Sequence, residues 1–364
     1  MPTLSRRDFS RKLFLGAGAA ALTGYAAGPF PFRTRADAPL GVALVGLGYY
    51  STDLLAPALQ LTRHCRLAGI VTGTPEKAVR WKAQYNIPDA NIYNYETFDR
   101  IAENPDIDVV YVVLPPSMHA EYSIRAARAG KHVWCEKPMA MTVEECQAMI
   151  DAARENGVKL SIGYRLQHEP NTREIMRLAR EEPYGPVRLV TAAAGYFDGR
   201  TDHWKQKKAL GGGSMYDMGV YPLNAARYST GEEPVAVLAQ QFTNRPEIYT
   251  EVDETTMFQL EFPSGAIAQC VTSFGMGMNY LHVTYARGNA SLIPFQVYSN
   301  IQGQTPGGPL PPDEGNQQAR QMDDDALAIL NDTPVMVPGE EGLRDIRVVE
   351  AVYESARTGR RVEI

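Results

Sequence analysis

Gly46-Leu47-Gly48-Tyr49-Tyr50-Ser51 joins an apolar run, Leu40 to Val45, to a helix-compatible stretch that reaches Leu61. A continuous apolar run of this kind is typical of a strand that is buried on both faces of a parallel sheet. The first glycine permits a tight turn, and the second lets a pyrophosphate approach the backbone at the helix N-terminus. Ser51 replaces the usual third glycine or alanine, yet it is small enough for close helix–strand packing. The stretch predicts a dinucleotide-binding fold with Gly46, Gly48, Tyr50 and Ser51 at the cofactor.

Strand and helix patterns continue to alternate as far as Gly163. The next predicted strands are Leu67–Val71, Val109–Leu114, His132–Cys135 and Lys159–Gly163. This alternation is that of a doubly wound parallel α/β sheet. We therefore predict a Rossmann domain that binds NADP over residues 39–161.

The pattern changes after Tyr164. Runs at 235–243, 254–262, 266–274 and 282–286, partly with period-two alternation, predict a large and mostly antiparallel sheet. Residues 303–315 are rich in Gly and Pro and predict a loop without regular structure, and two helices, 316–331 and 342–358, close the chain. We predict an α+β domain for substrate binding and oligomerisation over residues 162–364.

Composition excludes several classes of protein. The 364-residue chain is 44% hydrophobic and 21% charged, as expected for a globular protein of two domains. Its net charge of −6 argues against a nucleic-acid partner. The four cysteines are scattered without a CxxC pair, so we expect buried thiols, no disulfide framework and no metal site.

The first 38 residues have the pattern of an export signal rather than of a folded element. Arg6 and Arg7 precede an apolar run, Leu13–Ala27, which is too short to span a bilayer, and Ala36-Asp37-Ala38 offers a cleavage site. The segment resembles a twin-arginine signal, and a disordered tail is the alternative. We expect a periplasmic protein that is exported folded and keeps no membrane anchor after cleavage.

The end of the second strand favours NADP over NAD. An NAD site would carry Asp or Glu there to bind the ribose 2′-hydroxyl. Here Val71 is followed by Thr72-Gly73-Thr74-Pro75-Glu76-Lys77, with Arg80 one turn later. Hydroxyls and cations suit a 2′-phosphate, so Thr72, Thr74, Lys77 and Arg80 are cofactor candidates. The alternative is an ordinary solvated helix start.

The predicted strand that starts at Val109 ends at Leu114, because prolines follow from Pro115 on. Ligands of doubly wound sheets bind at such carboxyl ends of strands. Leu114 and Pro115 are therefore cofactor candidates, as is Tyr95, which opens a predicted helix together with Phe98. His119 either contacts the nicotinamide half of the cofactor or caps the next helix.

Lys137 stands in Cys135-Glu136-Lys137-Pro138, directly after another predicted strand. Burying an ammonium is costly because desolvation disfavours the charged form. Lys137 is therefore either tolerated at the sheet edge or held at a reaction centre. Asp217 and Tyr221 follow a glycine-rich turn and are four apart, so on a helix they share a face and reach a common ligand. The alternative is an ordinary surface pair.

These pieces together resemble the glucose–fructose oxidoreductase, inositol dehydrogenase and rhizopine-catabolism family, nearest to its glucose–fructose and aldose–aldose oxidoreductase branch. The resemblance covers the chain after the export signal. Its motifs are GLGYYS at Gly46, AGKHVWCEKPM at Ala129, IGYRLQHEP at Ile162, GGGSMYDMGVYPLNAARY at Gly211 and EEGLRDIRVVEAVYESARTGR at Glu340.

The resemblance implies roles for individual residues. Lys137 and Tyr221 would be the catalytic pair, and Asp217 would orient the sugar and tune Tyr221. Arg165 would face the nicotinamide half together with Glu136 and Lys137. The pocket would be completed by Trp204, Lys205 and Tyr298. Inositol dehydrogenase-like members usually carry histidine at the position of Tyr221, which favours an aldose substrate.

Export adds a constraint, because no replenished nicotinamide pool exists outside the cytoplasm. The leading hypothesis is a periplasmic oxidoreductase with tightly bound NADP, which oxidises an aldose to its lactone and reduces a second sugar, aldose or ketose, to a polyol. Only Pro39 separates the predicted cleavage site from the first strand, so the long Pro-rich arm of the glucose–fructose enzyme is missing, and we expect a homodimer through the C-terminal sheet. The alternatives are a sugar dehydrogenase that exchanges free cofactor and a non-catalytic NADP or sugar sensor.

Overall fold

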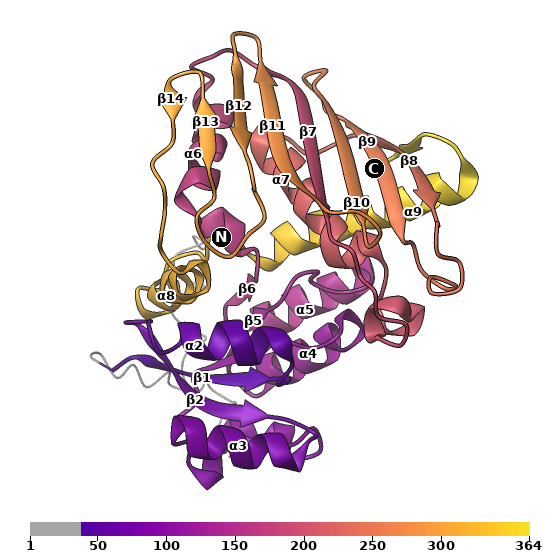
Figure 1. Cartoon of the computed structure of the whole chain (residues 1–364). Helices are drawn as coiled ribbons and strands as arrows, with labels where there is room; N and C mark the ends of the chain where they lie inside the picture. Colours follow the sequence, from indigo (N-terminus) through magenta and orange to yellow (C-terminus); the bar gives the residue numbers. More distant parts are fainter. Residues whose placement is uncertain (1–37) are drawn as a thin grey trace, which may run out of the picture. The chain divides into compact units, whose positions relative to one another are not determined.

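The computed structural model describes residues 38–364 (Figure 1). All of the predicted export signal except Ala38 lies outside the described residues. Within 38–364, no helix has the length and hydropathy that a membrane span requires.

The first sheet has six parallel strands in the order β3-β2-β1-β4-β5-β6. Its strands are β1 (Leu40–Val45), β2 (Cys65–Val71), β3 (Ile92–Tyr93), β4 (Val109–Val112), β5 (His132–Cys135) and β6 (Leu160–Ile162). Its main helices are α2 (Ala56–Ala58), α3 (Pro75–Tyr85), α4 (His119–Arg128) and α5 (Val143–Glu155). This order is that of a Rossmann sheet, and the predicted fold is confirmed.

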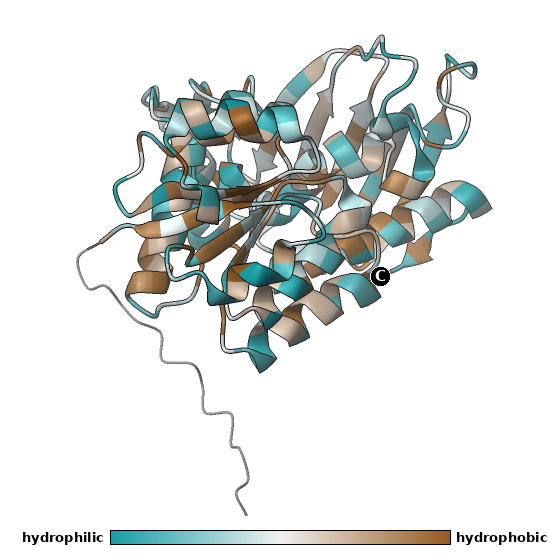
Figure 2. Cartoon of the chain, turned by 90° about the horizontal axis from the view of Figure 1, so that it is seen from below, coloured by the Kyte–Doolittle hydropathy of each residue, from teal (hydrophilic) through white to brown (hydrophobic). Residues whose placement is uncertain are grey.

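Both faces of this sheet are covered, which explains the uninterrupted apolar runs. Along β1, Val42 and Leu44 point into one apolar cluster, whereas Ala43 and Val45 point into the other. In Figure 2 the brown central strands lie between helices whose outer turns are largely teal. Because every side chain of β1 has an apolar layer to enter, its sequence does not alternate.

The second sheet has nine strands in the order β14-β13-β12-β11-β7-β10-β9-β8-β15, and only the β7–β10 pair is parallel. Its strands are β7 (Val187–Gly195), β8 (Ala236–Phe242), β9 (Thr255–Glu261), β10 (Ile267–Ser273), β11 (Met278–Tyr285), β12 (Asn289–Leu292), β13 (Gly303–Thr305), β14 (Gly308–Pro309) and β15 (Val362–Glu363). The helices of this part are α6 (Pro170–Glu181), α7 (Val220–Thr230), α8 (Gln317–Leu330) and α9 (Gly339–Thr358). The predicted mostly antiparallel sheet is confirmed.

In residues 38–364, helices cover one face of the second sheet and leave the other open. Figure 1 shows α7 and α9 running along it, and both helices contact its strands. The other face carries exposed apolar side chains on β8, β9 and β10, namely Leu238, Phe242, Met257 and Ile267. Leu238, Met257 and Ile267 are flanked by buried residues along their strands, so the open face there follows from the sequence period, whereas the end of β8 at Phe242 is exposed on successive residues.

A buried ion cluster fastens α7 to α9. The guanidinium of Arg227 bonds to Asp345, to Glu341 at 3.0 Å and to Glu233 at 2.7 Å. Burial raises the pKa of Asp345 to about 6. Burial alone would also raise the pKa of Glu341, but the cations of Arg227 and Arg344 outweigh it and lower that pKa to about 2. Glu341 is therefore the partner that is held in its charged form.

Local predictions were wrong in two places. Residues 303–315 are not wholly irregular, because β13 and β14 form a hairpin there around Pro306 and Gly307. The helix predicted to open at Tyr95 and Phe98 is a 3₁₀ helix over Phe98–Glu103, which Tyr95 precedes. Both segments are shorter than the windows in which periodicity can be recognised.

Candidate functional site

The turn after β1 has room for a phosphate. Gly46 has φ +90°, and a Cβ atom there would lie 2.3 Å from the carbonyl oxygen of Val113, so only glycine fits. Around Gly48, by contrast, a Cβ atom would have no neighbour within 4 Å in the described chain, and the residue is exposed. The Ser51 hydroxyl is buried and donates to the Gly46 carbonyl at 2.6 Å. The turn is thus fixed from behind and open at Gly48, which fits a pyrophosphate group.

Of the residues predicted at a 2′-phosphate, two contact other parts of the protein and two are exposed to solvent. Thr72 is buried, and its hydroxyl accepts from the backbone N–H of Thr74 at 3.2 Å. Lys77 donates to the carbonyl of Leu47 in the glycine turn at 2.9 Å. Thr74 and Arg80 are exposed. Thr74 and Arg80 therefore remain free to meet an anion at this edge, while Lys77 supports the turn.

The Tyr95 ring lies beside the chain segment that follows β2. A Cβ atom at Gly73 would lie 3.1 Å from the Tyr95 ring, so the ring covers the backbone just after β2. Tyr95 itself packs against Tyr122 with ring centroids 5.4 Å apart. It therefore offers one edge of an aromatic surface beside the candidate phosphate site.

Both ring nitrogens of His119 face backbone carbonyls, and its side chain caps no helix in the described chain. It is buried at the start of α4, with Nδ1 2.8 Å from the Pro138 carbonyl and Nε2 2.7 Å from the Leu114 carbonyl. Burial lowers its pKa, so the neutral ring has one N–H to donate between the two carbonyls. His119 thus joins the loop after β4, with half-buried Leu114 and Pro115, to the loop after β5.

Glu136 is buried directly after β5. One of its carboxylate oxygens accepts from the Tyr111 hydroxyl at 2.7 Å, and the other from the N–H of Lys137 at 3.3 Å. Burial raises its pKa despite these bonds. A Cβ atom at Gly163 would lie 2.7 Å from this carboxylate, so a side chain there would displace the Glu136 carboxylate from its present position.

Tyr221 lies between two cations. Lys137 Nζ is 4.5 Å from the centroid of its ring, and the Arg165 guanidinium carbon is 5.8 Å from it. Burial of Tyr221 favours the neutral phenol, and Glu136 acts in the same direction. Lys137 and Arg165 together outweigh both and bring the Tyr221 pKa below its ordinary value. The arrangement gives a buried phenol that can accept and return a proton.

Asp217 precedes α7 and is fixed by two lysines. Lys205 Nζ lies 2.6 Å from Asp217 Oδ2, and Lys137 Nζ lies 3.9 Å from Oδ1 while it donates to the Asp217 carbonyl at 2.7 Å. Burial alone would raise the pKa of Asp217, but Lys205 and Lys137 lower it. Tyr196 also donates to Asp217 at 3.4 Å. Asp217 is therefore coupled to Tyr221 through Lys137, which touches both.

The Arg165 guanidinium lies near the rings of Tyr221 and Tyr298. The Arg165 guanidinium carbon is 4.7 Å from the Tyr298 ring, and the Tyr50 and Tyr298 rings are 6.2 Å apart. Arg165 is buried, and its Nε and Nη2 have no hydrogen-bond partner among residues 38–364. Trp204 lies on the Lys205 side, 5.7 Å from that ammonium. Unpartnered donors of this kind fit a polar ligand beside Tyr50 and Tyr298.

Profiles of one oxidoreductase family match almost all of the described chain. The family's NAD-binding Rossmann domain matches residues 40–164, its GFO/IDH/MocA C-terminal domain residues 172–291, and its C-terminal α/β domain residues 302–364. The chain belongs to the GFO/IDH/MocA family. The resemblance found in the sequence motifs is confirmed.

Individual members of the GFO/IDH/MocA family match over nearly their full length. The crystal structure of an aldose–aldose oxidoreductase from Caulobacter crescentus, complexed with glycerol, has a TM-score of 0.87 and 45% identity, covering 90% of this chain and 100% of that one. The D-xylose 1-dehydrogenase (NADP(+)) of Haloarcula marismortui is 30% identical, covering 90% of this chain and 93% of the relative. The D-glucoside 3-dehydrogenase of Escherichia coli is 28% identical, covering 90% and 98%.

Sequence reasoning missed three polar side chains at this GFO/IDH/MocA site. The Gln296 side chain is among the groups that lower the Tyr221 pKa, the Tyr196 hydroxyl donates to Asp217, and the Tyr111 hydroxyl donates to Glu136. A signal existed for Tyr111, which is the only residue with a polar tip in the apolar run VVYVVL. Gln296 lies in a loop between β12 and β13, where no spacing rule indicates which residue turns inward.

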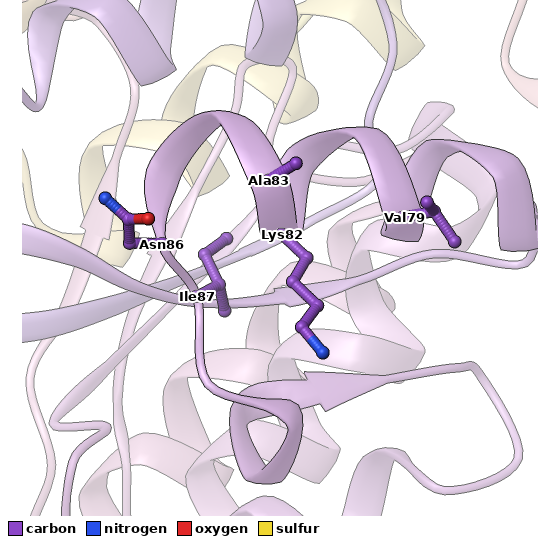
Figure 3. Close-up of a pocket in the computed structure, with 5 residues that line it drawn as sticks. All are labelled: Val79, Lys82, Ala83, Asn86 and Ile87. Atoms are coloured by element: carbon purple, nitrogen blue, oxygen red, sulfur yellow. The ribbon is translucent and has the colours of Figure 1, made fainter.

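A separate hollow of about 470 Å³ lies on the outer side of α3 (Figure 3). It is lined by Val79, Lys82, Ala83, Asn86 and Ile87, and none of the predicted site residues is among them. The Lys82 ammonium pairs with Asp89. Between residues 38 and 364, no cluster of three or more His, Cys, Asp or Glu side chains could hold a metal ion. The candidate chemistry of the described chain is therefore concentrated around Tyr221.

Proposed function

We propose that this protein is a periplasmic aldose oxidoreductase with tightly bound NADP, which oxidises one aldose to its lactone and reduces a second sugar to an alditol. The observation that carries the proposal is Tyr221 held between the cations of Lys137 and Arg165. Support comes from the GFO/IDH/MocA relatives, which include an aldose–aldose oxidoreductase at 45% identity and a D-xylose 1-dehydrogenase.

The chain's own residues account for the proton transfer. Tyr221 takes the proton of the sugar hydroxyl during oxidation and returns it to the developing alkoxide during reduction. Lys137 stabilises the phenolate in the first direction and the alkoxide in the second. Asp217, fixed by Lys205, accepts a hydrogen bond from a second sugar hydroxyl and so orients the ring. Bound NADP would supply the redox chemistry, by accepting a hydride from one sugar and donating it to the next.

The fit to NADP rests on the end of β2. No carboxylate stands there to bind a 2′-hydroxyl, while Thr74 and Arg80 are exposed at that edge. The pyrophosphate would lie over Gly48, and the nicotinamide half beside Tyr50, Arg165 and Tyr298. A structure of similar fold, the scyllo-inositol dehydrogenase from Lactobacillus casei, holds NAD(H), and the choice of NADP for this chain is part of the proposal.

Retention of the cofactor follows from the proposed export. Outside the cytoplasm no enzyme replenishes nicotinamide cofactors, so continued turnover requires that the same bound molecule be reduced and reoxidised. We also propose a homodimer. The exposed apolar side chains Leu238, Phe242, Met257 and Ile267 on the open sheet face would be buried between two copies.

The test uses exhaustively dialysed protein with no added cofactor. Glucose should generate the absorbance of bound reduced nicotinamide, and a second sugar should bleach it, with lactone and alditol as products. Tyr221→Phe should abolish both steps although the protein remains folded. Turnover that appears only with added NADP would instead identify a conventional sugar dehydrogenase. Retained turnover in Tyr221→Phe would remove the proposed role of Tyr221.

A further inference from the structure

Helix α8 reaches two of the charges that act on Tyr221, Arg165 directly and Glu136 through Tyr111. Gln317 and Gln321 lie four residues apart on α8 and so share one face. Both side chains are about 1% exposed. Gln317 contacts Arg165, and Gln321 contacts Tyr111, whose hydroxyl bonds to Glu136. Each glutamine therefore reaches a different charge.

We propose that Gln317 and Gln321 are positioning residues, which hold two opposite charges against Tyr221: Gln317 holds the Arg165 cation directly, and Gln321 holds the Glu136 carboxylate through Tyr111. The inference deepens the proposed function, since it rests on proton transfer by Tyr221.

Hydrogen-bond chemistry fixes the orientation of both amides. A guanidinium only donates, so Gln317 must turn its oxygen to Arg165 Nη1. The Tyr111 hydroxyl donates to Glu136 at 2.7 Å, so its oxygen must accept from the Gln321 amide at 3.2 Å. The remaining amide atoms, Gln317 Nε2 and Gln321 Oε1, have no partner within the described chain. Each buried amide is thus committed to a single contact toward the site.

The helix is anchored independently of these contacts, so it can serve as a fixed support. The Asp323 carboxylate accepts from the backbone N–H groups of Arg63 and His64, at 2.9 and 2.8 Å, just before β2. Asp324 bonds to His168 Nδ1 at 2.8 Å. These contacts join α8 to the Rossmann sheet and to the 3₁₀ helix Arg165–His168 that carries Arg165.

The two charges that the glutamines contact, Arg165 directly and Glu136 through Tyr111, shift the Tyr221 pKa in opposite directions. Arg165 stabilises the phenolate and lowers the Tyr221 pKa, whereas an ionised Glu136 raises it. The hydrogen bond from Tyr111 favours the ionised form of Glu136, which burial otherwise disfavours. The titratable groups that act on Tyr221 or on these two charges are Lys137, Arg165, Glu136, Tyr50, Tyr298 and Tyr111. Of these, α8 contacts Arg165 and Tyr111 through the two glutamines.

The experiment titrates Tyr221 in the full protein by NMR of ¹³Cζ-labelled tyrosine, with the Tyr221 signal assigned from its loss in Tyr221→Phe. In Gln317→Met, Arg165 loses its side-chain acceptor and keeps the Val297 carbonyl, which accepts from Nη1 at 2.8 Å, and the Tyr221 titration should move up by about half a pH unit or more. In Gln321→Met and Tyr111→Phe, Glu136 is more readily neutralised, and the titration should move down by a similar amount. The double variant Tyr111→Phe/Gln321→Met should match Tyr111→Phe alone, because both changes interrupt the same series of hydrogen bonds from Gln321 through Tyr111 to Glu136.

Gln318→Met is the matched control, since Gln318 is equally buried one residue away on α8 and contacts no group of the site in the described chain. It should leave the titration in place. Should Gln317→Met not fold, Gln317→Glu keeps the contact, neutralises Arg165 and should also move the titration up. Shifts of the Tyr221 titration in the same direction in the Gln317 and Gln321 variants, or no shift in folded variants, would overturn the positioning role. The titration needs no turnover, so it tests the positioning role independently of the proposed function. The proposed function is tested by the activity of Tyr221→Phe, and retained activity would contradict it.

Discussion

Replacing Lys137 by methionine removes the nearer of the two cations from Tyr221. The ammonium lies 4.5 Å from the ring centroid, and its side chain is 12% exposed. At an effective dielectric constant of about 20, unit charges ~4.5 Å apart interact by roughly 3–4 kcal/mol, or about two to three pKa units. Arg165 remains and compensates in part. We therefore expect the Tyr221 pKa to rise by about one to two units.

The consequence is visible in the pH dependence of sugar oxidation. In this direction Tyr221 acts as a base, so the rate rises with pH through the Tyr221 pKa. Lys137→Met should move this limb to higher pH and lower the single-turnover rate at neutral pH by roughly 10- to 100-fold. The assay is rapid mixing of dialysed protein with glucose from pH 5 to pH 10, under the optical readout of reduced nicotinamide.

Lys137→Arg is the matched control for charge. It keeps a cation near the ring, so the limb should move by less than half of the shift in Lys137→Met. An unshifted limb in Lys137→Met, with a folded protein and bound cofactor, would refute the electrostatic role of Lys137. Equal shifts in both variants would show that shape and not charge matters at this position.

Three further results are expected. Gly46→Ala should abolish cofactor binding and lower the melting temperature, because its Cβ would lie 2.3 Å from the Val113 carbonyl; retention of bound nucleotide after purification would contradict this. Lys205→Met should lower kcat/KM for the sugar about tenfold or more, since Asp217 loses a charge-assisted bond of 2.6 Å, with little change in melting temperature. Glu341→Gln should reduce the loss of unfolding free energy that occurs on acidification. With a pKa lowered to about 2, Glu341 stabilises the fold above pH ~4.5 and loses this contribution, about 3 kcal/mol, toward pH ~2. Denaturant unfolding between these pH values measures it, and the same pH dependence in the variant would argue against the assignment.

The sequence was most informative where one residue type alone satisfies the local geometry. Gly46 and the apolar run before it predict the turn of β1, because a positive φ and two buried faces leave few alternatives. Lys137 and Tyr221 were paired only through the family resemblance. The structure brings them together across 84 positions of sequence, a separation that no periodicity spans.

Other contacts of the site could not be predicted, for a physical reason. The contact of the Lys205 ammonium with Asp217 could not be predicted, because a flexible four-carbon side chain reaches several groups from one backbone position. Gln317 and Gln321 reach the site from a helix that follows the second sheet in sequence. Their spacing indicates a shared helix face, but only the packed fold shows that this face is turned toward Arg165 and Tyr111.

The central claim is that one bound cofactor passes a hydride from one sugar to another. The most direct measurement supplies dialysed protein with glucose deuterated at C1, a second unlabelled aldose, and a large excess of free unlabelled NADPH. A closed cycle predicts that deuterium appears at C1 of the alditol without dilution by the free pool. Alditol that carries hydrogen from the free NADPH would contradict the account and show that the cofactor exchanges in every turnover.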